Sequence, residues 1–195
     1  MRIIGGIFRG RKLANATKLT IRPATDRVKQ TIFDVLNNHL EFSKKIILDT
    51  FAGTGSLGIE ALSRGAEKII FVENSFSSID IIKKNISILN METHCEIVKS
   101  DAINFFNSTQ KKFDLIFADP PYSFELTKEI PKIIFEKNIL NANGILVIEH
   151  TKHCEKFLDE NNFYIFSQKK FGQTIVSFFK HNEKKENNCT LSGNF

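Results

Sequence analysis

From residue 46 onward, short apolar segments alternate with segments of helical periodicity, and this alternation is the strongest constraint on the fold. The strand-like segments are nearly continuous apolar runs, at residues 46–49, 68–73, 95–100, 113–118 and 144–149. Strands of this kind are typical of a parallel sheet that helices cover on both faces. We therefore expect a Rossmann-like α/β fold with a mostly parallel sheet.

The segments around these strands carry the signals of helices and of one hairpin. Residues 25–26 can cap a helix, residues 79–89 repeat apolar side chains at helical spacing, and Pro131 suits the first turn of a later helix. Two strand-like segments, 163–170 and 174–179, lie only a few residues apart. They predict a hairpin, so the last strand should run antiparallel to its partner.

The positive charge of the chain is concentrated at its N-terminus. Residues 1–30 hold eight Lys and Arg against one acid, whereas the other 165 residues hold 19 basic and 21 acidic side chains. This asymmetry indicates contact with a polyanion such as a nucleic acid, although a solvated arm that aids solubility is the alternative. The side chains that we expect to contact RNA phosphates are Arg2, Arg9, Arg11, Lys12, Arg22 and Arg27.

We divide the chain into a basic arm or hairpin at residues 1–24, one α/β domain at residues 25–181 and a disordered polar tail at residues 182–195. The three cysteines are odd in number and widely spaced, which favours a reducing compartment. Neither a signal peptide nor a membrane span is predicted, and the histidines form no metal-binding pattern. We expect a cytoplasmic monomer without a metal.

A glycine loop follows the first strand-like segment. Residues 49–58 read Asp-Thr-Phe-Ala-Gly-Thr-Gly-Ser-Leu-Gly, which contains the spacing Gly-x-Gly-x-x-Gly of a nucleotide-binding turn. Glu73 ends the next strand about 20 residues later, where a carboxylate can accept ribose hydroxyls. The expected cofactor-binding residues are Asp49, Phe51, Gly53, Thr54, Gly55, Glu73, Asn74, Asp101 and Ala102.

These features fit either NAD or S-adenosylmethionine, and two carboxylates favour the second. Asp49 suits a ligand with a sulfonium and an ammonium but would repel a pyrophosphate. Asp101 ends the third strand, where it can accept a hydrogen bond from an adenine amine. The alternatives are that Asp49 partners a helix N-terminus and that Asp101 caps the following helix.

The fourth strand-like segment ends in Asp119, Pro120, Pro121 and Tyr122, the residues that we expect to be catalytic. Two prolines end the strand in a stiff turn between a carboxylate and an aromatic ring. Such a turn can hold a planar amine, because Asp119 and the Pro120 carbonyl accept its two N–H groups while Tyr122 stacks on the base. The alternative is a plain turn with Asp119 as a cap.

The glycine loop, Glu73, Asp101 and the Asp-Pro-Pro-Tyr tetrad resemble class I S-adenosylmethionine-dependent amino-methyltransferases. Residues 1–13 and 22–28 resemble the bacterial family that methylates guanine N2 in 16S ribosomal RNA of the small subunit; Ala24 departs from its usual pattern. The resemblance implies a seven-stranded sheet of order 3-2-1-4-5-7-6, S-adenosylmethionine as donor, and small-subunit RNA or an assembly intermediate as partner.

Three other functions remain open at the level of the sequence. The tetrad alone does not name the base, so an adenine-N6 or cytosine-N4 methyltransferase acting on DNA or RNA is one of them. The glycine loop also fits an NAD-dependent oxidoreductase. The third is a catalytically inactive RNA-binding assembly factor that keeps the cofactor fold.

Overall fold

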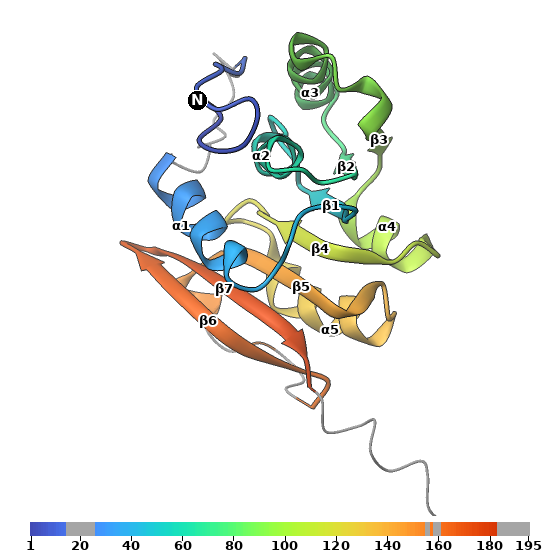
Figure 1. Ribbon diagram of the computed structural model, residues 1–195. Helices are drawn as coiled ribbons and strands as arrows, with labels where there is room; N and C mark the ends of the chain where they lie inside the picture. The colour runs from blue at the N-terminus through green and yellow to red at the C-terminus, as the bar shows by residue number, and fades with distance from the viewer. Residues whose placement is uncertain (15–25, 155–156, 158–160, 183–195) are drawn as a thin grey trace, which may run out of the picture.

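The computed structural model describes residues 1–14, 26–154, 157 and 161–182, and Figure 1 shows a central sheet between two layers of helices. Within these residues the sheet has seven strands in the order β3-β2-β1-β4-β5-β7-β6. Strand β7 is antiparallel to both β5 and β6, whereas the other pairs are parallel. The predicted fold and C-terminal hairpin are therefore confirmed. The strands are β1 (Ile46–Thr50), β2 (Lys68–Glu73), β3 (Cys95–Lys99), β4 (Phe113–Ala118), β5 (Leu140–Thr151), β6 (Phe163–Phe171) and β7 (Thr174–His181).

Helices cover both faces of the sheet because alternate residues of the strands are apolar on both sides. Ile47 packs in a core with the first three helices, while its neighbour Leu48 packs in a second core with the other two. The α-helices are α1 (Asp26–Asn37), α2 (Ser56–Ser63), α3 (Phe76–Leu89), α4 (Ala102–Ser108) and α5 (Ile130–Glu136). Short 3-10 helices occur at η1 (Glu92–His94), η2 (Glu125–Glu129) and η3 (Lys152–Cys154).

Two elements differ from the sequence-based expectation. Helix α4 was not predicted, although a helix after Asp101 was one alternative for that residue. Strand β5 begins at Leu140 rather than at residue 144, and its pairing with β4 shifts register between Phe113 and Leu115. The polar residues 141–143 occupy this irregular start, so the apolar run in the sequence marks only the regular part of the strand.

The N-terminal residues lie against helix α2 in a hairpin-like loop. Arg2 bridges Lys12 in antiparallel fashion, and Ile3 is 1% exposed. A Cβ added to Gly6 would lie 1.8 Å from the carbonyl oxygen of Ser63, so the backbone approaches the end of α2 closely. The predicted arm at residues 1–24 continues into residues 15–25, and the predicted tail is described only at residue 182, so most of both predictions lies outside the described residues.

A buried carboxylate fastens this N-terminal loop to α2. Glu60 accepts the N–H groups of Ile4 and Gly5 at 2.8 and 2.7 Å. It also pairs with Lys29 of α1 at 3.5 Å and with Arg64 at 3.0 Å, and the Lys29 and Glu60 side chains are fully buried. Burial lowers the pKa of Lys29, and the neighbouring charge of Glu60 opposes that effect.

Asn85 of α3 makes a second connection between this loop and the rest of the domain. Its Oδ1 accepts the N–H of Ala14 at 2.7 Å, and its Nδ2 donates to the carbonyl of Thr54 in the glycine loop at 3.0 Å. The side chain is completely buried. One amide therefore bridges the N-terminal loop and the turn that follows β1. No helix in the described ranges is both long and apolar enough to cross a membrane.

Candidate active site

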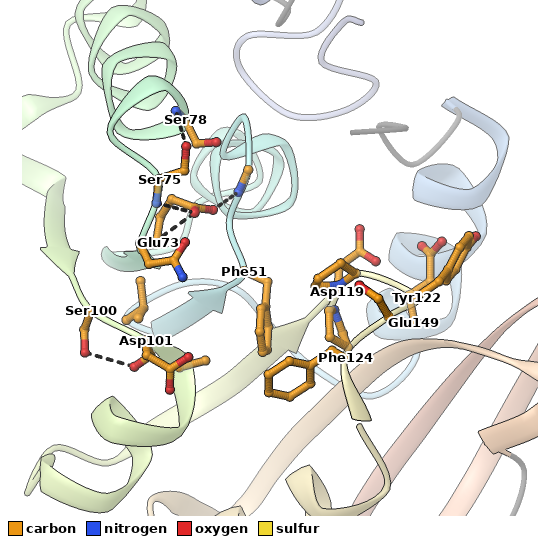
Figure 2. A pocket seen from close by; sticks show the side chains of 17 residues that line it. Phe51, Glu73, Ser75, Ser78, Ser100, Asp101, Asp119, Tyr122, Phe124 and Glu149 are labelled. Carbon is orange, nitrogen blue, oxygen red and sulfur yellow. Dashed lines mark hydrogen bonds between the residues drawn. The ribbon is translucent and has the colours of Figure 1, made fainter. Parts of the chain in front are cut away.

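A cavity of about 600 Å³ opens where β1 to β5 end, the position at which ligands bind to open α/β sheets. Figure 2 shows Glu73, Ser75 and Ser78 on one side and Asp119, Tyr122 and Glu149 on the other, with Phe51 and Phe124 between them. The cavity is lined by Phe51, Gly53, Val72, Glu73, Asn74, Ser75, Ser78, Ser100, Asp101, Ala102, Asp119, Pro120, Pro121, Tyr122, Ser123, Phe124 and Glu149.

The glycine loop turns from β1 into α2 in a left-handed conformation. Gly53 and Gly55 have φ of 55° and 75°, values that favour glycine. A Cβ on Gly58 would lie 2.5 Å from Phe71 Cε1, so this glycine lets α2 pack directly on β2. Of the three glycines, only Gly53 lines the cavity. The spacing of the motif therefore also reflects the shape of the turn and the packing of α2 on β2.

Asp49 lies beneath this loop rather than in the cavity wall. Its Oδ2 accepts the N–H of Gly58 in the first turn of α2 at 2.8 Å, and the residue is 2% exposed. Burial raises the pKa of Asp49 to about 8, against a smaller opposing effect of the Gly58 hydrogen bond. The structure thus places this residue as a partner of the helix N-terminus, the alternative to a direct contact with the ligand.

Glu73 is held rigidly at the end of β2. Its Oε1 accepts the N–H groups of Asn74 and Ser75, both at 2.9 Å, and its Oε2 accepts that of Gly53 at 2.9 Å. A carboxylate has about four acceptor positions, so Oε2 keeps one for a ligand hydroxyl. Nearby, Ser78 Oγ lines the cavity and is buried without a hydrogen-bond partner among the described residues.

Asp101 and Ala102 lie where β3 passes into α4. Asp101 is the N-cap of this helix, and its Oδ1 accepts the N–H groups of Ile103 and Asn104 at 2.9 and 3.2 Å. Asp101 therefore caps the helix, as the alternative interpretation of the sequence expected. Only Oδ1 takes part in the cap, and the residue also lines the cavity. Ala102, the first residue of the helix, lines the cavity beside it.

Two phenylalanines separate the halves of the cavity. The rings of Phe51 and Phe124 meet edge to face with centroids 5.0 Å apart. Phe51 has a φ of 55°, which is unusual for a residue with a bulky side chain and is typical of positions under functional constraint. Sequence reasoning included Phe51 among the expected cofactor contacts, and the structure adds Phe124.

The tetrad forms the opposite wall. Pro120 is buried, while Tyr122 is 62% exposed, and its hydroxyl lies 2.9 Å from Thr174 Oγ1 at the start of β7. Asp119 keeps some contact with solvent through the cavity. The protein packed around it raises the pKa of Asp119 well above the usual range, and the charges of Glu149 and Asp49 add to this effect.

Of the expected site residues, the structure brings ten to the cavity wall: Phe51, Gly53, Glu73, Asn74, Asp101, Ala102, Asp119, Pro120, Pro121 and Tyr122. Asp49, Thr54 and Gly55 do not line it. The expected RNA contacts lie elsewhere: Arg2, Arg9, Arg11, Lys12 and Arg27 are exposed, and Arg22 falls outside the described residues. Arg2 pairs with Asp26 at 3.1 Å, and the Arg11 guanidinium lies 5.2 Å from the centre of the Phe8 ring.

Glu149 is the main cavity residue that sequence reasoning missed. It lies near the end of β5, within a segment that we assigned only as a strand. The signal was present, because the same rule that selected Glu73 and Asp101 points to a carboxylate at the end of any parallel strand in the sheet. Ser78 of α3 had no comparable signal in the sequence.

Comparison with known proteins places this fold and cavity in a class. A family model described as "Conserved hypothetical protein 95" matches residues 1–180. A solved structure titled "Putative methyltransferase yhhF from Escherichia coli" superposes with a TM-score of 0.81 at 28% identity, over 93% of this chain and 97% of that one. The order of the strands is that of these methyltransferase structures, and the chain is an S-adenosylmethionine-dependent methyltransferase.

The sequence relatives narrow the class to one family. The chain is 35% identical to the ribosomal RNA small subunit methyltransferase D of Haemophilus influenzae, over 91% of each chain. It is 30% identical to the protein of the same name from Escherichia coli, over 97% of this chain and 94% of the relative. The chain therefore belongs to the Conserved hypothetical protein 95 family, a family of ribosomal RNA methyltransferases.

Proposed function

We propose that this chain transfers a methyl group from S-adenosylmethionine to the exocyclic N2 amine of a guanine in 16S ribosomal RNA of the small subunit. The observation that carries the proposal is the position of Asp119 and Tyr122 across one cavity from Glu73 and Asp101. An amine held at the tetrad then faces a donor held at the ends of β2 and β3. The small subunit as substrate is supported by the names of the two relatives.

The cavity residues fit the donor. The cavity volume of about 600 Å³ lies within the usual range for small-molecule sites. The free acceptor position of Glu73 and the unpaired Ser78 Oγ provide polar contacts for a ribose, while Asp101 can accept the adenine amine. Bound S-adenosylmethionine supplies an electrophilic methyl group: the amine lone pair forms the C–N bond, the S–C electrons stay on sulfur, and the nitrogen loses a proton.

The tetrad then orients the acceptor. An aromatic amine is a weak nucleophile because its lone pair is delocalised into the ring. Asp119 and the Pro120 carbonyl accept its two N–H groups, which fixes the nitrogen and stabilises the positive charge that develops on it. The Tyr122 ring is open to the base on one side and is tethered to β7 through its hydroxyl. Stacking of this kind is worth about 1–3 kcal/mol.

The proposal is tested with small subunits that lack the modification. The protein is incubated with these particles and methyl-labelled S-adenosylmethionine, and the RNA is digested to nucleosides. We expect label in N2-methylguanosine, no transfer by Asp119→Ala, and unchanged transfer by the matched surface variant Glu125→Gln, whose side chain is exposed outside the cavity.

Each alternative gives a different result. Label found only in methylated adenosine or cytidine would mean that the acceptor is the adenine N6 or cytosine N4 amine rather than guanine N2. Heat released on titration with NAD, with none for S-adenosylmethionine, would identify an oxidoreductase. RNA binding without any transfer by the wild-type protein would leave only the role of an assembly factor.

A further inference from the structure

Glu149 faces the tetrad from the neighbouring strand. Ala118 of β4 pairs in register with Ile148 of β5, so Asp119 and Glu149 follow at the same level of two parallel strands. Residues paired in this way direct their side chains to the same face of the sheet. Both line the cavity, and Figure 2 shows them close together beside Tyr122.

The location of Glu149 associates it with the acceptor rather than with the donor. Glu73 and Asp101 lie on the other side of Phe51 and Phe124 in Figure 2. The charged groups facing Asp119 are Asp49 from β1 and Glu149 from β5, and of these only Glu149 lines the cavity. A base held by Asp119 therefore lies within reach of a second carboxyl group. The atoms of the base next to its amine must form a favourable contact with that group.

Guanine matches two neighbouring acceptors better than the other bases that carry an amine. Its Watson–Crick edge presents the N2 amine next to the N1–H, so that two donors stand side by side, with the O6 acceptor beyond them. In adenine and cytosine the ring nitrogen next to the amine is an acceptor, which a carboxylate repels. Discrimination of this kind is large when a buried polar group of the site would be left unpaired.

We propose that Glu149 accepts the N1–H of the target guanine while Asp119 accepts an N–H of its amine, so that Glu149 selects guanine over adenine and cytosine. This inference rests on the proposed function, since it concerns the base held at the same tetrad. It assigns to β5 a specificity contact that the tetrad itself does not provide.

The test uses 2-aminopurine, which keeps the N2 amine but has no hydrogen on N1. The labelled guanine is first located by analysis of RNase fragments of the methylated RNA. Small subunits are then assembled with guanine or 2-aminopurine at that position, and kcat/KM is measured for wild type and Glu149→Gln. We expect wild type to prefer guanine about 10- to 100-fold, as for loss of a hydrogen bond to a charged group. The variant should lose most of this preference, because its amide can donate to the bare N1. 2-Aminopurine also lacks the O6 of guanine, but this loss affects both proteins alike, so it cancels when the preference of the variant is compared with that of wild type.

The controls separate recognition from folding. Glu125→Gln, which removes an exposed carboxylate near the tetrad, should keep the wild-type preference. If Glu149→Gln fails to bind S-adenosylmethionine in calorimetry, Glu149→Asp takes its place, and its shorter side chain should reduce the preference. An unchanged ratio in the variant that folds, or no preference in wild type, would overturn the inference. Absence of N2-methylguanosine with wild type would instead refute the proposed function.

Discussion

Asp119 lies where three strands bring carboxyl groups together, and its charge depends on its neighbours. Dense packing raises its pKa most, and the charges of Glu149 and Asp49 raise it further. A raised pKa keeps the acid protonated over a wider range of pH, so the acceptor form appears only as the pH rises. Activity that requires the Asp119 carboxylate should therefore increase as the pH rises.

We expect kcat/KM of the wild-type protein to rise with pH through a limb that lies well above 3.8, the ordinary pKa of an aspartate. In Asp119→Asn the amide oxygen still accepts one N–H, so activity should fall about 10- to 100-fold and the limb should disappear. The measurement is a pH–rate profile on small subunits for both proteins. A limb of the same position in the Asn variant would assign it to another group.

The cavity residues differ in how well the sequence predicts them. Glu73 ends β2, while Asp101 and Asp119 come just after β3 and β4, and all three could be located from the strand pattern alone. Asp49 ends a strand too, yet its side chain turns under the loop to Gly58, which no spacing reveals. Glu149 ends the apolar run at residues 144–149, so the same pattern pointed to it as well, although the strand itself continues to Thr151.

At the scale of elements, the contact between α2 and β2 holds the glycine loop in position. Gly58 has no room for a side chain, because Phe71 Cε1 and Ile69 Cγ2 would lie 2.5 and 2.8 Å from its Cβ. Both neighbours are core residues of β2 with almost no exposure. Any larger residue must push α2 away from the sheet and take the loop with it.

We therefore expect Gly58→Ala to lower the free energy of unfolding by about 1–3 kcal/mol, the usual cost of overpacking, and to weaken S-adenosylmethionine binding. The matched control is Gly172→Ala in the β6–β7 turn, where a Cβ meets nothing within 4 Å but φ is +63°. It should cost about 1–2 kcal/mol through backbone strain and leave cofactor affinity unchanged. Urea unfolding and calorimetry measure the two effects; equal cofactor affinity in both variants would contradict this account.

The strands buried on both faces are among the elements that the sequence predicted well. The central strands β1, β2 and β4 read as continuous apolar runs, so their ends could be placed closely. Helix α4 is only seven residues long, and its two adjacent phenylalanines lie between two asparagines, so it shows no apolar stripe at helical spacing. Its formation depends on the Asp101 cap and on packing of Phe105 and Phe106, which local sequence does not report.

At the scale of the molecule, Glu60 joins the N-terminal loop to α1 and α2. The ion pair with Lys29 is fully buried, so its desolvation makes it sensitive to removal of either charge. A glutamine at position 60 would also direct its amide hydrogens at one of the N–H groups of Ile4 and Gly5, which the carboxylate now accepts together.

Glu60→Gln should therefore destabilise the protein by about 3–5 kcal/mol, the cost of leaving a buried charge unpaired. The control is Glu96→Gln, which breaks solvent-exposed ion pairs with Lys68 and Lys111 and should cost at most about 1 kcal/mol. Urea unfolding curves give both values. Similar losses in the two variants would show that burial of the Glu60 cluster adds nothing.

The exposed arginines of the N-terminal loop should bind RNA backbone. We expect Arg9→Ala with Arg11→Ala to weaken binding to small-subunit RNA and to reduce the slope of log affinity against log salt by about 1.4–1.8, for two phosphate contacts. Lys112→Ala with Lys137→Ala removes the same charge from exposed positions before β4 and β5, at the ends of these strands away from the cavity, where it should have little effect. Binding is measured by filter retention at several salt concentrations, and equal slopes in the two double variants would exclude this role.

Asn85 has a consequence for the order in which ligands act. A single buried amide holds both Ala14, next to the basic N-terminal loop, and Thr54, in the turn beside the donor. Any displacement of one partner is felt by the other through two hydrogen bonds. By thermodynamic linkage, whatever factor RNA binding applies to the affinity for S-adenosylmethionine, the cofactor applies to the affinity for RNA, and Asn85 joins the two regions through its hydrogen bonds.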